Sequence, residues 1–285
     1  MSIAIITGVT SGIGQAASYL LPDLGYKTIY LVGRNQRKLE SLKIDLNQKH
    51  KDLDLIIKVA DLSDFKQVQT LAQELFVETK ESGIDLFLNN AGLGQDRRSE
   101  NTQGFELHLA TNYLSQVILS EKLFPNLNKD SFTIFTSSYA YMGAKVDFDN
   151  MNLEQNFSMI KAYANSKAYQ MMYAKLLRTR LETQNPKNLH FEAIHPGFVR
   201  TGFGKSDTSL LIKIFLWLSR PLTLSPEQSA SHNLLSPIYP QNQEDLGKAD
   251  IWSNGKPVVT KKSFMELENL KKLWKYTEKS LEKYL

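Results

Sequence analysis

The chain has 285 residues, of which 42% are hydrophobic and 22% charged, proportions typical of a globular protein with a substantial buried core. Its net charge of +4 is too small to predict a nucleic-acid-binding surface, so we expect no nucleic-acid partner. The absence of cysteine excludes disulfides, thiolate catalysis and cysteine-based metal sites. The five histidines show no metal-ligand spacing, so we expect no metal.

Two properties bear on location. No stretch reaches the roughly 18 consecutive apolar residues that a membrane-spanning helix needs. The apolar run Ile3–Ile6 follows almost directly on the first residue, without a basic segment or a cleavage site before it. We therefore expect a cytoplasmic location.

Apolar runs of strand length alternate with amphipathic segments of helix length over about the first 200 residues. The expected strands are Ile3–Thr7, Thr28–Val32, Leu55–Val59, Leu86–Asn89, Phe132–Thr136 and His190–His195. The expected helices are Ile13–Leu24, Asn35–Gln48, Phe65–Lys80, Phe105–Phe124 and Ala162–Glu182. This alternation predicts an α/β fold, a single Rossmann-type domain over residues 1–285, with a doubly wound parallel sheet and helices on both faces.

The remaining part of the chain has a different character. Leu210–Leu218 is its most apolar stretch and is flanked by Lys205, Arg220 and Pro221. A helix is expected to follow Pro226, and a Lys/Glu-rich amphipathic helix is expected from Phe264 to Tyr284.

A glycine-rich turn, Thr7-Gly8-Val9-Thr10-Ser11-Gly12-Ile13-Gly14, joins the first strand to the first helix. Gly8 can form a tight turn, Gly12 lets the backbone approach a pyrophosphate, and Gly14 lets the helix pack closely on the strand. The free N–H groups and positive dipole end of the helix would then face phosphates. An ordinary strand-to-helix loop is the alternative, but the position after the first strand favours a dinucleotide site.

Arg34 follows the second strand, at the tip that faces the adenosine ribose in a dinucleotide-binding fold. An acidic residue there selects a free 2′-hydroxyl, whereas a guanidinium accepts a 2′-phosphate. The sequence therefore predicts NADP(H). The alternative is that Arg34 only begins the next helix, with Arg37 and Lys38 as surface charge.

Tyr163 and Lys167 lie four residues apart in a predicted helix, so their side chains project from one face. A lysine cation beside a phenol favours the phenolate, and we expect it to lower the pKa of Tyr163 towards neutral pH. Tyr163 could then act as general acid for carbonyl reduction and as base for alcohol oxidation. The bare pattern is also common on helix surfaces.

Five motifs in this order resemble the short-chain dehydrogenase/reductase family: the glycine turn, Asn89-Asn90-Ala91-Gly92, Ser137-Ser138, Tyr163-Ala164-Asn165-Ser166-Lys167 and Pro196-Gly197. The resemblance implies that Ser138 hydrogen-bonds the substrate oxygen and that Tyr163 exchanges a proton with it. It implies that Lys167 reaches the nicotinamide ribose, and that Asn112 holds a water linking Lys167 to solvent. The four implied catalytic residues are Asn112, Ser138, Tyr163 and Lys167.

The resemblance also implies the cofactor contacts. Asp61 and Leu62 would lie at the adenine, and the segment after the sixth strand would cradle the nicotinamide carboxamide, with His195 as a structural residue at the strand end. The expected contact residues are Gly8, Thr10, Ser11, Gly12, Ile13, Gly14, Arg34, Asp61, Leu62, Asn90, Ala91, Gly92, Tyr163, Lys167, Pro196, Gly197, Val199 and Thr201.

Within the family the chain is similar to the retinol-dehydrogenase-like branch. The similarity rests on Gly33-Arg34-Asn35, on the 25-residue spacing from Ser138 to Tyr163, and on Ile251–Lys256 and Leu273-Trp274. It implies hydride transfer between NADP(H) and the carbonyl or alcohol of an apolar small molecule, such as an aldehyde, ketone, retinoid or terpenoid. The alternatives are reduction of an activated C=C bond and a non-catalytic NADP(H)-sensing protein.

Residues 200–240 fall where the family places its substrate-binding lid, and an apolar lid implies an apolar substrate. The apolar 210–218 segment could instead be ordinary core or a helix making peripheral contact with a membrane surface. The family often forms homodimers through its fourth and fifth helices, and a homodimer is kept as an open alternative for this chain.

Overall fold

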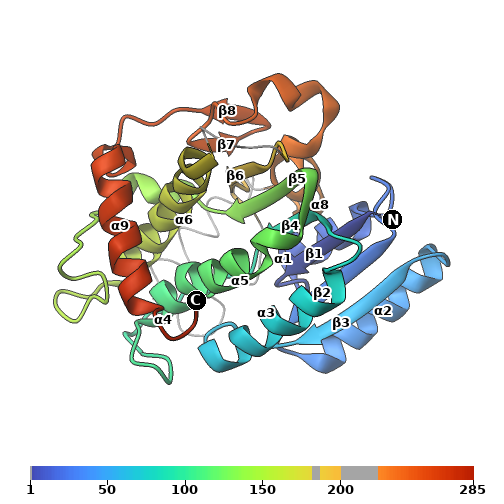
Figure 1. The fold of residues 1–285 in the computed structure, drawn as a ribbon, viewed down its shortest axis with the longest axis horizontal. Helices are drawn as coiled ribbons and strands as arrows, with labels where there is room; N and C mark the ends of the chain where they lie inside the picture. Colours follow the sequence, from blue (N-terminus) through green and yellow to red (C-terminus); the bar gives the residue numbers. More distant parts are fainter. Residues whose placement is uncertain (1, 182–186, 200–223) are drawn as a thin grey trace.

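The computed structural model describes residues 2–181, 187–199 and 224–285 (Figure 1). In this part of the chain eight strands form one sheet in the order β3-β2-β1-β4-β5-β6-β7-β8. Neighbouring strands are parallel except for the antiparallel pair β7–β8. The strands are β1 (Ile3–Thr7), β2 (Thr28–Gly33), β3 (Asp54–Val59), β4 (Ile84–Asn89), β5 (Leu127–Thr136), β6 (His190–His195), β7 (Ile251–Ser253) and β8 (Lys256–Val258).

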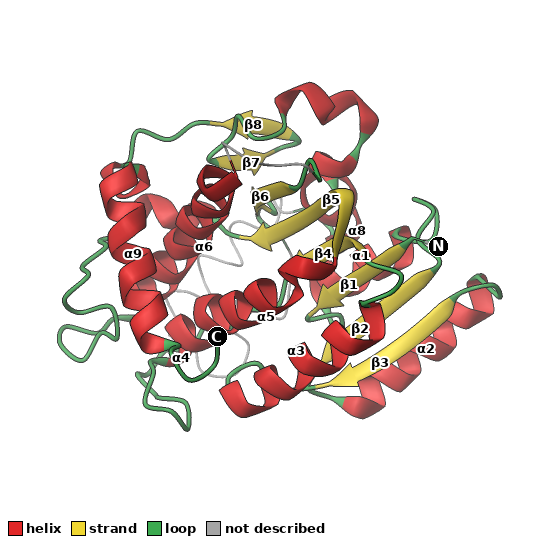
Figure 2. Cartoon of the chain, viewed as in Figure 1, coloured by secondary structure: helices red, strands yellow, loops and turns green. Residues whose placement is uncertain are grey.

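Helices cover both faces of this sheet, as Figure 2 shows in red against yellow strands. The helices are α1 (Gly12–Leu20), α2 (Gln36–Lys49), α3 (Phe65–Thr79), α4 (Leu107–Leu109), α5 (Ser115–Leu123), α6 (Met159–Leu181), α8 (Pro226–Ser229) and α9 (Leu267–Ser280). Shorter helical turns are η1 (Ala110–Leu114), η2 (Phe124–Asn126), η3 (Tyr139–Gly143), η5 (Ala230–Leu234), η6 (Ser236–Ile238), η7 (Pro240–Asp245) and η8 (Ser263–Met265). The predicted fold class, a doubly wound α/β sheet, is confirmed.

Two hydrophobic cores fill the spaces between the sheet and its helices. One core packs α3, α5, α6 and α9 on one face, with residues such as Phe65, Val117 and Met171. The other packs α1, α2 and η5 on the opposite face, with Leu21 and Leu39. Because both faces are covered, all five residues of β1 are buried, and four of the five are apolar. This rigid sheet fixes the strand ends that carry the candidate site.

The structure adds a hairpin that the strand prediction did not include. β7 and β8 are three residues each, too short for a periodicity signal, and they are joined by Asn254 and Gly255. Both turn residues have positive φ, +51° and +70°, as a two-residue hairpin turn requires. An Asn-Gly pair is itself a hairpin signal, so the sequence did contain the information.

The predicted helix Phe105–Phe124 is interrupted. It consists of α4, the π-helical turn η1 and α5, and Asn112 lies inside η1. A π-turn inserts one extra residue into a helix and so redirects the side chains around it. Helical periodicity does not reveal this interruption, because residues on both sides of it are buried.

Helix α9 packs beside α6, where Figure 1 shows it in red, and closes the first core. The hydroxyls of Tyr113 and Thr277 are hydrogen-bonded at 2.7 Å. The Trp274 ring is stacked against Tyr173, and the guanidinium of Arg180 lies 3.7 Å over the Trp274 ring centroid. The helix is shorter than the predicted Phe264–Tyr284 at both ends: Ser263–Met265 form a separate 3-10 turn, and α9 ends at Ser280.

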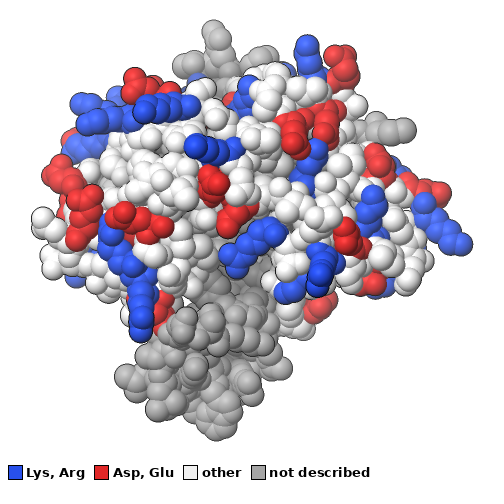
Figure 3. Space-filling model, turned by 90° about the horizontal axis from the view of Figure 1, so that it is seen from below, with Lys and Arg blue, Asp and Glu red and all other residues white. Residues whose placement is uncertain are grey.

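The described surface carries both signs of charge. Figure 3 shows blue Lys and Arg side chains interspersed with red Asp and Glu side chains on the face in view. Within the described residues, no helix is long and apolar enough to cross a membrane.

Candidate active site

The glycine turn between β1 and α1 has the close packing that its residues predict. Gly8 and Gly12 adopt φ of +74° and +61°, a backbone region that side chains disfavour. A Cβ added at Gly14 would lie 2.5 Å from the carbonyl oxygen of Gly8, so only glycine fits. The N-cap residue Ser11 makes no side-chain cap bond, and the first turn of α1 carries no acidic residue. Its backbone N–H groups therefore remain suited to an anion.

A hydrogen-bonded latch holds this turn against the end of β4. The Asn90 side chain donates to the carbonyls of Thr7 (2.9 Å) and Gly8 (3.3 Å). The Thr7 hydroxyl accepts from the backbone N–H groups of Asn90 and Ala91, both at 3.0 Å. β1 and β4 are neighbours at the point where the strand order reverses, which is where open α/β sheets bind ligands. Asn90 thus shapes the turn, and a Cβ built on Gly92 would lie 3.2 Å from Asn112 Oδ1 and 3.5 Å from Lys167 Nζ.

Arg34 and Asp61 lie at the ends of β2 and β3. Arg34 is exposed and has no ion pair among the described residues; Asn35 after it caps α2 by accepting from Lys38 N–H at 3.0 Å. Asp61 accepts from the Ser63 backbone N–H (2.9 Å), and the N-cap of α3 is Asp64 rather than Asp61. The ribose-phosphate and adenine roles of these residues stay predictions.

Ser138 lies at the carboxyl end of β5, and Tyr163 of α6 is brought to it. The two side chains are hydrogen-bonded. The preceding Ser137 is buried and donates to the Lys167 carbonyl at 2.8 Å, which ties α6 to the strand end. His195 of β6 accepts from the Tyr139 N–H at 3.2 Å, and burial lowers the pKa of His195 to about 4. A neutral His195 therefore anchors the turn after Ser138, in agreement with its structural interpretation.

Lys167 lies next to Tyr163, with its Nζ atom 5.4 Å from the centre of the Tyr163 ring. The predicted lowering of the Tyr163 pKa is wrong. Burial raises that pKa to about 12, and the hydrogen bond with Ser138 opposes the rise. Burial also lowers the pKa of Lys167 to about 7, so its cation is only partly formed near neutral pH and influences the phenol weakly.

Two acceptors hold the Lys167 ammonium. Nζ donates to the Thr136 carbonyl at 2.8 Å and to Gln170 Oε1 at 3.0 Å. An ammonium has three N–H donors, so one is left without a partner among the described residues. That donor could hydrogen-bond a hydroxyl group or a water.

Asn112 is fully buried and is hydrogen-bonded to the loop after β4. Its Oδ1 accepts from the Leu93 N–H at 2.8 Å, and its Nδ2 donates to the Leu93 carbonyl and to Ser166 Oγ, both at 3.0 Å. Asn112 therefore joins this loop to the Tyr163–Lys167 segment of α6. Its predicted role in holding a water stays a prediction.

The Pro196-Gly197 segment follows β6, as expected. The Pro196 carbonyl accepts from Ser229 and from Asn233 Nδ2, the latter at 3.1 Å. Gly197 has a φ of +83°, and Val199 pairs with Leu224 in a parallel bridge. Thr201 and the apolar 210–218 segment, with Lys205, Lys213, Arg220 and Pro221, lie outside the described residues, as does most of the proposed 200–240 lid.

Sequence reasoning missed several residues that support the site. They are the latch residue Thr7, the Pro196 partners Ser229 and Asn233, and the buried amides Gln116 and Gln170. Thr7 lies inside a strand-like run, and the glutamines lie inside helices that are buried nearly all round. None of these positions stands out by spacing or by composition.

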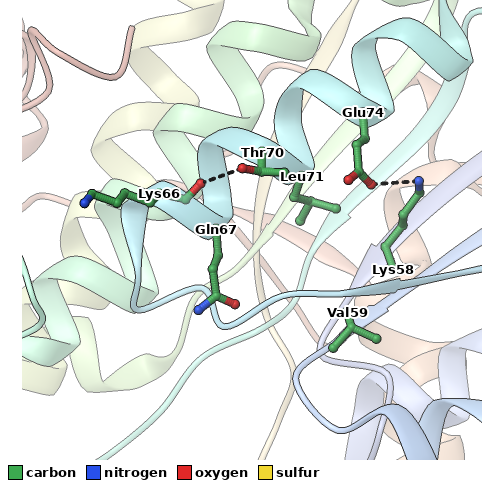
Figure 4. A pocket seen from close by; sticks show the side chains of 7 residues that line it. All are labelled: Lys58, Val59, Lys66, Gln67, Thr70, Leu71 and Glu74. Carbon is green, nitrogen blue, oxygen red and sulfur yellow. Dashed lines mark hydrogen bonds and ion pairs between the residues drawn. The ribbon is translucent and has the colours of Figure 1, made fainter.

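A cavity of about 210 Å³ lies elsewhere, between β3 and α3 (Figure 4). It is lined by Lys58, Val59, Lys66, Gln67, Thr70, Leu71 and Glu74. The amine of Lys58 is paired with Glu74 at 2.9 Å, so the cavity offers no free cation from that residue. None of the candidate site residues lines it. Within the described residues, no group of three or more His, Asp or Glu side chains could hold a metal ion.

Comparisons with known proteins agree with this arrangement. A family model described as short chain dehydrogenase matches residues 2–210. Retinol dehydrogenase 12 of Homo sapiens is 27% identical over 235 residues, covering 81% of this chain and 72% of the relative. Retinol dehydrogenase 14 of Homo sapiens is 26% identical over 291 residues, covering 96% and 84%.

The fold also matches solved structures. NADPH-bound carbonyl reductase from chicken fatty liver has a TM-score of 0.65 and 21% identity, covering 91% of this chain and all of that one. At this identity the likeness establishes the shared fold alone. The family model spans most of the chain and includes the glycine turn, Ser138, Tyr163 and Lys167. The chain belongs to the short-chain dehydrogenase family, in its retinol-dehydrogenase-like branch.

Proposed function

We propose that the chain is an NADP(H)-dependent oxidoreductase that interconverts a carbonyl compound and its alcohol. The observation that carries the proposal is the convergence of Ser138, Tyr163 and Lys167 at the carboxyl ends of β4 and β5, beside the glycine turn. A protein that only bound the dinucleotide would not need a phenol hydrogen-bonded to a serine at this place. NADP(H) is supported by the phosphate-binding features of the turn, by Arg34, and by the NADPH-bound carbonyl reductase of the same fold.

Tyr163, Ser138 and Lys167 each have a different role in the proposed reaction. Since burial holds the Tyr163 pKa near 12, the phenol stays protonated at neutral pH and can donate its proton to a carbonyl oxygen during reduction. The Ser138 hydroxyl can donate a hydrogen bond to the negative charge that develops on that oxygen. The third N–H of Lys167 can hold a ribose hydroxyl, and the bound dinucleotide supplies or accepts the hydride.

The direct test is a panel of aldehydes, ketones and secondary alcohols, followed by NADPH absorbance. We expect turnover with apolar carbonyl compounds, because the 210–218 segment of the sequence is the most apolar in the chain and falls at the family's lid position. No turnover with any member of the panel, while NADPH still binds, would favour the binding-protein alternative.

Replacing Arg34 by aspartate is expected to reverse the cofactor preference. Losing a charge-assisted phosphate contact and adding a repelling carboxylate should raise the KM for NADPH by about 10–100-fold, with a much smaller change for NADH. Steady-state kinetics with both cofactors measures this. Lys43→Asp changes the net charge equally but lies farther along α2, and is the control. An unchanged preference in Arg34→Asp would show that Arg34 does not contact the 2′-phosphate.

We also expect the chain to be monomeric. Every residue from Ala164 to Ala174 of α6 is buried within the single chain, as are the first six residues of α5. Helix α9, through Trp274 and Thr277, covers part of this face. Light scattering should therefore give a mass near 32.4 kDa. A mass near twice that value would contradict the expectation and restore the homodimer alternative.

A further inference from the structure

Three buried polar side chains form a chain of hydrogen bonds from the active-site lysine to the Asn-Asn-Ala-Gly turn. Lys167 Nζ donates to Gln170 Oε1 at 3.0 Å, and Gln170 Nε2 donates to Gln116 Oε1 at 2.7 Å. Gln116 Nε2 in turn donates to the Ala91 carbonyl at 3.1 Å. All three side chains are at most 4% exposed. Burying two neutral amides between α5 and α6 is costly unless both are satisfied, as they are here.

The direction of this chain is fixed at both ends. With Lys167 protonated, its ammonium can only donate and the Ala91 carbonyl can only accept, so each amide then has a single favourable orientation. Turning either amide would place two oxygens or two NH₂ groups face to face. The two ends of this chain of hydrogen bonds lie close together, because a Cβ built on Gly92, next to Ala91, would lie 3.5 Å from Lys167 Nζ.

We propose that Gln170 is a positioning residue for the proposed hydride-transfer reaction, and that with Gln116 it sets the place and the charge of Lys167. Burial disfavours the ammonium form of Lys167, and the hydrogen bond that Gln170 Oε1 accepts from Nζ stabilises that form. Through Gln116 the same bonds couple the lysine to the turn that shapes the dinucleotide cleft. The inference rests on the proposed function of Lys167, and it extends the site to two residues on the inner faces of α5 and α6.

Among the residues that the structure describes, few ionisable groups surround this lysine. Tyr163 lies on the same helix as Lys167. The ring centroid of His108 in α4 is 6.5 Å from that of Tyr163, and His195 of β6 accepts a hydrogen bond from Tyr139 in the turn after Ser138. Within the described part of the chain, Lys167 makes no ion pair. The neutral oxygen of Gln170 is therefore one of the two groups that hold the charge, with the Thr136 carbonyl.

The test compares Gln170→Met and Gln170→Glu. Methionine removes the acceptor, so the protonated lysine is lost at lower pH; a carboxylate strengthens the acceptor, so protonation persists to higher pH. The alkaline limb of the kcat profile should therefore move down in pH for Gln170→Met and up for Gln170→Glu. Gln170→Met should also lower kcat by about tenfold, the effect of one lost bond to a charged group.

A second readout needs no turnover. An NMR titration of Lys167 across pH, in protein labelled with 13C at the lysine Cε and without cofactor, reports the fraction of free amine. The pH midpoint of Lys167 should move down in Gln170→Met and up in Gln170→Glu, as the alkaline limb of the kcat profile does. Gln116→Met breaks the chain one link farther away, and should produce a smaller shift with non-additive effects in the double variant.

Asn126→Leu is the matched control, because it removes a buried amide that bonds the Phe76 carbonyl (2.7 Å) and Thr79 Oγ1 (2.9 Å), far from the site. It should lower the melting temperature without moving either pH midpoint. If both Gln170 variants keep the wild-type pH midpoint of Lys167 in the NMR titration, the inference is overturned. If the midpoints move but the wild-type chain turns over no carbonyl compound, the inference stands and the proposed function fails.

Discussion

Replacing Tyr163 by phenylalanine is expected to reduce turnover by about 10²–10⁴-fold, the usual contribution of one general acid–base group. The substitution removes only the phenolic oxygen, which is hydrogen-bonded to Ser138, and keeps the ring beside Lys167. NADPH affinity should therefore stay close to that of the wild-type chain. Single-turnover kinetics and a fluorescence titration with NADPH measure the two quantities separately.

Tyr113→Phe is the control for this change. It also removes a buried hydroxyl, which bonds Thr277 in the core, so it should lower stability by about 1 kcal/mol and leave kcat nearly unchanged. Retention of more than about a tenth of the activity in Tyr163→Phe would contradict the acid–base role, given the size of that contribution.

Replacing Gly14 by alanine is expected to produce the second largest effect. The added methyl group would lie 2.3 Å from Asn90 Nδ2 and 2.5 Å from the Gly8 carbonyl oxygen, so the latch or the turn must move. Overpacking of this kind costs about 1–3 kcal/mol. Because the displaced groups form the turn, we expect NADPH affinity to fall by about tenfold or more, together with the melting temperature.

Gly143→Ala provides the comparison for Gly14→Ala. No atom of the described residues lies within 4 Å of a Cβ built at Gly143, and its backbone does not have a positive φ. Its methyl group should leave stability unchanged to within about 0.5 kcal/mol. Normal NADPH binding by Gly14→Ala would contradict the assignment of the glycine turn to the cofactor.

The parts of the site that the sequence predicted are those set by local rules. The strand and helix periods placed Ser138, Tyr163 and the glycine turn at the correct element ends, since strand order and right-handed crossovers leave few arrangements. Helical spacing also placed Lys167 beside Tyr163.

What the sequence could not predict depends on contacts between distant segments. The Tyr163 pKa rises because burial outweighs the hydrogen bond with Ser138, and burial is a property of the assembled fold. The chain of amides through Gln116 and Gln170 exists only because α5 and α6 lie side by side, and the two residues are 54 positions apart. The π-turn at Asn112 does not change the hydrophobic pattern of the sequence, because this helix is buried on all sides.

The latch between Thr7 and Asn90 has a consequence for the order of folding. It joins residues 83 positions apart, so the glycine turn acquires its bound geometry only after β4 has docked beside β1. Three helices and two strands lie between β1 and β4 along the chain, and such long-range pairing is intrinsically slow. The ability to bind a dinucleotide is therefore acquired late in folding. A bound dinucleotide in turn stabilises the long-range contacts of this half of the sheet and not the turn alone.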